Sequence, residues 1–152
     1  MRESIGQAFL VNLVAIIVGV TIFILVGAVV YSKTFKIKTK LVDIMEKYKD
    51  NPNVYEAARD EMEYYLLSIG YRRNVNSTQT CPNKKNGEVL NETSSIFHYC
   101  VYEFDDGEGI SRGKYYGVLV YIYFDFPLIG DLIEIPVYGE TEVFFDSVYI
   151  EG

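Results

Sequence analysis

Residues 8–31 read AFLVNLVAIIVGVTIFILVGAVVY, an apolar run whose only plainly polar members are Asn12 and Thr21. As an α-helix this run would measure about 36 Å, which is enough to cross a hydrocarbon core of about 30 Å. A single isolated span has to satisfy its own backbone hydrogen bonds, so the sequence predicts a transmembrane helix. A cleaved signal peptide is the alternative interpretation, but its apolar region would be shorter, at about 7–15 residues.

Helical periodicity continues without a break after this run. Apolar side chains recur at helical spacing, at Ile37, Leu41, Ile44, Met45 and Tyr48. We expect one helix from about Ile5 to Lys49, about 68 Å long at the same rise, with an apolar first half and an amphipathic second half. The predicted division of the chain is a transmembrane and stalk helix over residues 1–49 and an extracytoplasmic head over residues 50–152.

A second, shorter helix is predicted after residues 50–53, whose sequence Asp-Asn-Pro-Asn breaks the first helix. Asn53 and Glu56 match a capping box, in which two side chains bond backbone N–H groups of the first turn. An apolar stripe follows at Val54, Ala58, Met62, Tyr65, Leu66 and Ile69. Gly70 stands where a helix commonly ends. We expect this helix to pack on the first helix or on a sheet.

The remaining sequence predicts a β-rich head. Residues 71–95 are polar and turn-rich, so we expect a long loop there. Strands are expected at 96–104, 115–126, about 133–137 and 143–150. The predicted fold class is therefore α+β, with a long N-terminal helix, a short second helix and an antiparallel sheet of three or four strands.

The expected strand at 115–126 has two different faces. One carries Val118, Val120, Ile122, Phe124 and Phe126, and it should face the helices. The other carries Tyr115, Leu119, Tyr121, Tyr123 and Asp125. The chain holds 14 Tyr and no Trp, and tyrosine suits protein interfaces. This tyrosine face therefore either packs across strands within one copy or contacts another protein.

Cys81 and Cys100 are the two cysteines of the chain. If the head lies outside the cytoplasm, we expect a disulfide between them that ties the long loop to the first strand. A single histidine, His98, and cysteines without paired spacing do not indicate a metal site. Residues 105–109 are acidic but lack the regular ligand ladder of a calcium loop, so we interpret them as a solvated turn.

The chain is acidic outside its N-terminal helix. From Leu41 onward, 9 Lys/Arg stand against 20 Asp/Glu, and the pI is about 4.7, which argues against a nucleic-acid partner. No phosphate loop, nucleophile elbow or catalytic Cys–His pair is recognisable. We therefore expect no enzyme activity, no cofactor, and no catalytic or metal-binding residue. Asn76 and Asn91 each begin an N-glycosylation pattern, which is common by chance.

Three small residues of the apolar run, Ala15, Gly19 and Gly27, fall near one side of the predicted helix. Small residues let helices approach each other closely in a membrane. We assign these three residues to helix packing between subunits, although Gly and Ala are also common in membrane helices generally. Before such packing, the partner of the run would be membrane lipid.

Charge and cysteine content point to different orientations. Four lysines follow the apolar run, at Lys33, Lys36, Lys38 and Lys40, whereas Arg2 precedes it and is offset by Glu3. The positive-inside rule alone would place the head in the cytoplasm. The short N-terminal tail, the two cysteines and the acidic β-rich head favour the opposite orientation, and long domains translocate with less regard to charge. We expect a single-pass membrane protein with an extracytoplasmic head.

This layout resembles type IV pilins, in which an apolar N-terminal helix extends into a head with an antiparallel sheet and often a disulfide. Residues 1–6, MRESIG, together with residues 31–33 and 44–48, are similar to small pilin-like membrane proteins of Gram-positive bacteria, which resemble pseudopilins of tight-adherence (Tad) pilus systems. Prepilins carry a Gly before their cleavage site and a Glu five residues after it. Gly6 can be matched to that Gly, but Val11 stands at the position of the Glu.

The resemblance implies a structural subunit, or a minor pilin-like component, of a surface filament assembled through packing of the N-terminal helix. Its partners would be copies of itself or other pilin-like subunits. The alternative hypothesis is a membrane-anchored extracytoplasmic binding module that does not polymerise. Such a module would use the loop at 71–95 or the tyrosine face to contact its partner.

Overall fold

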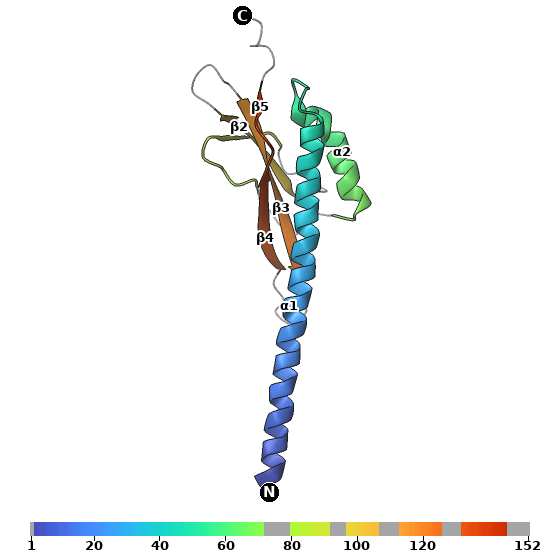
Figure 1. The fold of residues 1–152 in the computed structure, drawn as a ribbon, viewed down its shortest axis with the longest axis vertical. Helices are drawn as coiled ribbons and strands as arrows, with labels where there is room; N and C mark the ends of the chain where they lie inside the picture. Colours follow the sequence, from blue (N-terminus) through green and yellow to red (C-terminus); the bar gives the residue numbers. More distant parts are fainter. Residues whose placement is uncertain (1, 72–79, 92–96, 107–112, 126–131, 146–152) are drawn as a thin grey trace, which may run out of the picture. The chain divides into compact units, whose positions relative to one another are not determined.

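The computed structural model describes residues 2–71, 80–91, 97–106, 113–125 and 132–145 (Figure 1). Within these ranges the chain has the predicted α+β arrangement. Its elements are α1 (Arg2–Lys47), α2 (Val54–Ser68), β1 (Gly87–Val89), β2 (Tyr99–Asp106), β3 (Gly113–Asp125), β4 (Leu132–Glu140) and β5 (Phe144–Phe145).

Helix α1 runs without interruption from the apolar run into the amphipathic segment, which confirms the single helix predicted there. Contacts divide the chain into two compact units, Met1–Lys33 and Thr34–Gly152. This division falls earlier than the boundary at residue 49 that the end of the helix suggested. The physical reason is that α1 already contributes to a core in its second half, through the buried side chains Ile37, Leu41, Val42, Ile44 and Met45.

Helix α2 begins where the sequence predicts, but the predicted capping box does not form. Asn53 makes no side-chain capping bond, and its backbone N–H donates to Asn51 Oδ1 at 3.0 Å. In a capping box that N–H would bond the Glu56 side chain. Asn51 therefore takes the place of Glu56 by an Asx turn, in which a side chain bonds the backbone two residues on.

The C-terminus of α2 has the glycine-dependent ending that the sequence predicts. Gly70 has φ +69°, a left-handed conformation that a residue without Cβ adopts at little cost. The Gly70 N–H donates to Leu67 O at 3.1 Å and the Tyr71 N–H donates to Leu66 O at 2.9 Å. These two bonds are a Schellman motif, and they turn the chain from α2 toward the sheet.

The described strands form an antiparallel sheet in the order β1-β2-β3-β4, and the two-residue β5 pairs with Gly113 and Lys114 of β3. The prediction of loop throughout 71–95 was wrong at β1, which pairs with residues 102–104 of β2. A three-residue strand leaves no alternation to detect, because it is defined by its distant partner. Residues 107–109 of the predicted turn, Phe126 of the predicted strand and residues 146–150 of the last predicted strand lie outside the described residues.

Two hydrophobic cores lie on opposite faces of β2 and β3, since neighbouring residues of a strand point to opposite sides. The larger core includes side chains from both helices and both strands, among them Leu41, Met62, Val101, Val118 and Val120. The prediction that Val118 and Val120 face the helices is therefore confirmed. The smaller core consists of Cys100, Tyr102, Phe104, Leu119 and Tyr121.

The smaller core predicts a loss of stability in alkali. Burial raises the pKa of the Tyr102 phenol from 10.0 to about 12. Between these values the unfolded chain binds fewer protons than the folded chain, so the free energy of unfolding should fall as pH rises from 10 toward 12. Ultraviolet absorbance of the phenolate, followed with near-UV circular dichroism, should show ionisation coupled to unfolding. Tyr102→Phe should weaken this pH dependence, whereas Tyr64→Phe, at a side chain that is 74% exposed, should not.

Candidate functional site

The apolar part of α1 is the largest exposed hydrophobic surface among the described residues. Its large hydrophobic side chains from Phe9 to Val29, together with Tyr31, are 43–68% exposed. This helix is long and apolar enough to cross a membrane, and no residue of its most apolar 18-residue stretch is buried. Thr21 is compatible with lipid because its hydroxyl donates to Ile17 O at 2.8 Å within the helix.

The three small residues predicted to pack helices all lie in this exposed part of α1. Ala15 and Gly19 are exposed and Gly27 is half-buried. A Cβ added at Gly19 or Gly27 would meet no described atom within 4 Å. No described side chain of the same copy therefore fills the space beside these glycines. A larger side chain at either position would not clash with the described part of one copy.

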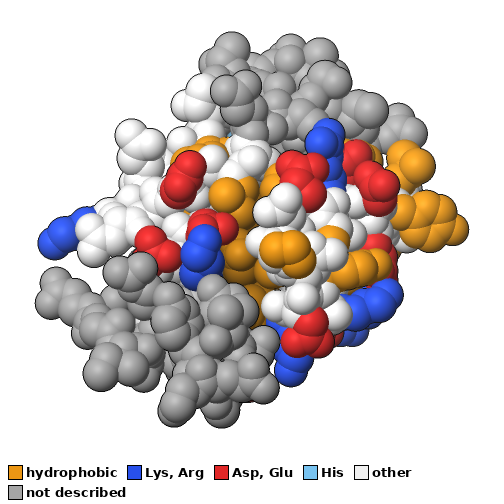
Figure 2. All heavy atoms as spheres, turned by 90° about the horizontal axis from the view of Figure 1, so that it is seen from above, with side chains coloured by type: hydrophobic (Ala, Val, Ile, Leu, Met, Phe, Trp, Pro, Cys, Tyr) orange, Lys and Arg blue, Asp and Glu red, His pale blue; other side chains and the backbone are white. Residues whose placement is uncertain are grey.

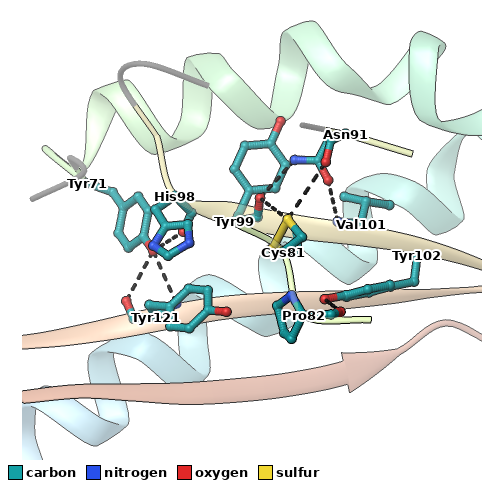
Figure 3. Close-up of a disulfide and its surroundings, with 10 residues drawn as sticks. Tyr71, Cys81, Pro82, Asn91, His98, Tyr99, Val101, Tyr102 and Tyr121 are labelled. Atoms are coloured by element: carbon teal, nitrogen blue, oxygen red, sulfur yellow. Dashed lines mark hydrogen bonds between the residues drawn. A yellow bond between two sulfur atoms is a disulfide. The ribbon is translucent and has the colours of Figure 1, made fainter. Parts of the chain in front are cut away.

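Cys81 and Cys100 are joined by a disulfide, with their Cα atoms 5.7 Å apart (Figure 3). Cys100 is fully buried in β2, in the smaller core, and Cys81 is half-buried against it. The bond fixes the start of the segment 80–91 on the sheet face opposite the helices. The Tyr102 hydroxyl holds the same segment by donating to Pro82 O at 2.8 Å.

The Asn91 side chain extends the hydrogen bonding of β1 to β2. Its Nδ2 donates to Tyr99 O at 2.8 Å, and its Oδ1 accepts from the Val101 N–H at 2.6 Å. The side-chain amide thus bonds the two backbone groups of β2 that would pair with β1 if β1 were longer (Figure 3). Because Asn91 is only 7% exposed and its nitrogen is engaged, the glycosylation pattern at this residue is not accessible in the folded chain. The pattern at Asn76 lies outside the described residues.

Tyr71 joins β2 and β3 just beyond the point where their ladder ends. Its hydroxyl donates to His98 O at 2.7 Å and accepts from the Tyr121 N–H at 3.2 Å. His98, the lone histidine, is buried and stacks on Tyr121 with ring centroids 4.0 Å apart. Figure 3 shows the three rings gathered at this end of the disulfide region. The arrangement is that of a packed, structural histidine.

The tyrosine face of β3 is mostly packed within the chain. Tyr121 is buried in the smaller core, while Tyr115 and Tyr138 are half-buried against that core. Lys84 covers Tyr138, with Nζ 3.8 Å from the ring centroid. Of the two alternatives, the structure therefore favours packing within one copy for these residues; the Tyr123 side chain lies outside the described part.

Charged groups elsewhere on the head are paired or dispersed. A pocket of about 380 Å³ beside the start of α2 is lined by Glu56, Glu88, Glu103 and Lys114, among others, and Lys114 bonds Glu103. Acidic, basic and hydrophobic side chains are intermixed on the surface seen in Figure 2. No group of three or more metal-ligating side chains occurs in the described ranges.

Comparisons with protein-family models, curated proteins and solved structures find no match. The resemblance to pilins therefore remains a prediction from layout.

The sequence analysis missed Tyr71 and Asn91, which join the loop to the sheet. Neither residue stands in a pattern that names its partner, because the bonded groups are backbone atoms 8 to 50 residues away. The one local signal was the position of Tyr71 directly after Gly70, where a Schellman motif fixes the direction in which the chain leaves the helix.

Removal of the Tyr71 hydroxyl should destabilise the head. Tyr71→Phe leaves His98 O and the Tyr121 N–H without this partner, which should lower the free energy of unfolding by about 1–3 kcal/mol. Tyr64→Phe is the matched control, because Tyr64 is 74% exposed, and it should change stability by less than about 0.5 kcal/mol. Denaturant titration of the full chain in detergent micelles measures both. Equal effects would contradict the bridging role.

Loss of the disulfide should also destabilise the head. Cys81→Ala/Cys100→Ala should lower the free energy of unfolding by about 2–4 kcal/mol, because the bond restricts the unfolded chain. The wild-type chain should lose a similar amount on addition of a thiol reductant, whereas the double variant should be insensitive to it. A wild-type chain whose stability does not respond to reduction would contradict this expectation.

Proposed function

We propose that this protein is a membrane-anchored structural subunit of a surface filament, or a minor pilin-like component of the machinery that assembles it. The observation that supports the proposal is the exposed apolar half of α1, attached to a head whose own cores are closed. A helix of this kind needs either lipid or other helices as its cover. Exchange of lipid for neighbouring helices is the physical step by which such a subunit would enter a filament.

The proposed orientation places the head outside the cytoplasm. Disulfides persist in oxidising compartments and are rare in the cytosol. The Cys81–Cys100 bond supports this orientation because it links the smaller core to the chain segment that Cys81 begins, and such a bond would be maintained in an oxidising compartment. The lysines that follow the span argue for the opposite orientation, and a translocated domain of this length can override them.

A non-polymerising, membrane-anchored binding module is the second candidate. The pocket beside the start of α2 is the observation in its favour, since a module needs a concave surface for its partner. Electron microscopy and mass spectrometry of material sheared from the cell surface separate the two candidates. A filament subunit requires this chain within filaments. If the chain stays in the membrane fraction, loss of filaments on its deletion would indicate an assembly component, and unchanged filaments would favour the binding module.

A substitution in α1 tests helix packing directly. Gly19→Leu should reduce filament assembly strongly, because added bulk would keep neighbouring helices apart, while the head should keep its stability since nothing described lies within 4 Å. Ala28→Leu is the matched control, nine residues away and therefore on the opposite side of the helix. Filament yield by shearing and head stability by denaturant titration are the two measurements. Normal filaments in Gly19→Leu would exclude this side of α1 as the contact.

A further inference from the structure

We propose that Lys36 and Lys40 of α1 bind the phosphate groups of anionic phospholipids at the membrane surface where the span ends. The inference rests on the membrane location given under the proposed function, and it adds a partner of stated chemistry, an anionic lipid headgroup. It holds for an anchored subunit before assembly and for an anchored module alike.

Lys36 and Lys40 are exposed on one side of α1. Lys36 and Lys40 are four residues apart, so their side chains emerge from the same side of α1, and both are exposed. Lys38 differs from them. Its side chain lies against Gly139 of β4, and its Nζ stands 4.2 Å from the centroid of the Phe35 ring. Lys38 is thus used within the head, whereas Lys36 and Lys40 face outward.

The charges of Lys36 and Lys40 are not neutralised by an ion pair with a described acidic side chain. The ion pairs found among the described residues join Lys47 to Glu61, Arg59 to Glu63 and Lys114 to Glu103. Lys36 and Lys40 take part in none of them. Hydrogen bonds from Lys47 and Tyr48 lower the pKa of the Glu61 carboxyl, and the charge of Lys40 contributes least among the cations that act on it. The Glu61 carboxylate, whose pKa the charge of Lys40 lowers, is therefore already bonded to Lys47.

Lys36 and Lys40 follow the end of the apolar run by a short distance along α1. The apolar run ends at Tyr31, so at 1.5 Å per residue Lys36 lies about 7.5 Å and Lys40 about 13.5 Å beyond it. The headgroup region adds about 5–8 Å to each side of the hydrocarbon core. Lys36 therefore falls at the edge of the headgroups, and Lys40 within about one Debye length of them at physiological salt. Long lysine side chains extend toward such an interface.

Electrostatic attraction at this position has a measurable size. Each lysine close to an anionic membrane surface gains about 1 kcal/mol, which is about fivefold in local binding. The remainder of the head would be repelled, since residues from Leu41 onward carry a net negative charge. The two lysines would therefore attract anionic lipid to the end of the span while the acidic head gains nothing from it.

The test uses the full chain, one copy per nanodisc, in phosphatidylcholine alone or with one-third phosphatidylglycerol. The rate at which an amine reagent labels each lysine is read by mass spectrometry. Phosphatidylglycerol should slow labelling of Lys36 and Lys40 by about two- to fivefold, and high salt should remove the effect. Lys49 and Lys85 are exposed lysines of the head and should react at the same rate in both lipids.

A pair of variants gives a second readout. Lys36→Gln/Lys40→Gln should reduce the phosphatidylglycerol that remains bound in native mass spectra, whereas Lys49→Gln/Lys85→Gln removes the same charge and should not. Equal labelling rates in both lipids, or equal lipid loss in both variants, would overturn the proposal. Protection that requires two copies per disc and is the same in both lipids would also overturn it, in favour of a second copy as partner. Failure of the chain to insert into the discs would instead refute the membrane location itself.

Discussion

The exposed apolar surface of α1 is the constraint on which the rest of the molecule depends. Burial of a Val, Leu, Ile or Phe side chain is worth about 1.5–3 kcal/mol, so the uncovered side chains between Phe9 and Tyr31 represent a free energy on the order of tens of kcal/mol. That exceeds the net stability of about 5–15 kcal/mol typical of a domain. Most of the described hydrophobic side chains of the head already belong to its own two cores.

The two hydrophobic cores of the head contain no side chain from the apolar half of α1. Its larger core draws on α1 from Ile37 onward, and Met1–Lys33 forms a separate compact unit. The smaller core is closed by a covalent bond, by the Tyr102 hydroxyl on Pro82 and by the Asn91 amide on β2. The Asn91 bonds satisfy the Tyr99 carbonyl and the Val101 N–H, which would otherwise be buried without a partner at a cost greater than a hydrogen bond gains.

Sequence reasoning recovered the features that depend on local periodicity and missed those that depend on distant partners. The run at 8–31, the stripe of α1, Gly70 and the strand faces at Val118 and Val120 each follow from spacing along the chain. The strand β1 and the bonds of Tyr71 and Asn91 do not, because their partners are backbone groups brought near only by the fold. The capping box at Glu56 failed for a local reason, because the Asn53 N–H bonds the Asn51 side chain two residues before it.

Under the proposed function, the balance between lipid and helix partners would follow from the chemistry of α1. Lipid tails are as apolar as its side chains, so exchange of one for the other involves little hydrophobic free energy, and close packing must favour the helix partner. Ala15, Gly19 and Gly27 leave the space that close packing requires, and the Thr21 hydroxyl already bonds within its own helix. Under the proposed function, the weak preference of such a helix would keep the subunit in the membrane until other forces extract it. Lysines held by anionic headgroups would add to the work of that extraction.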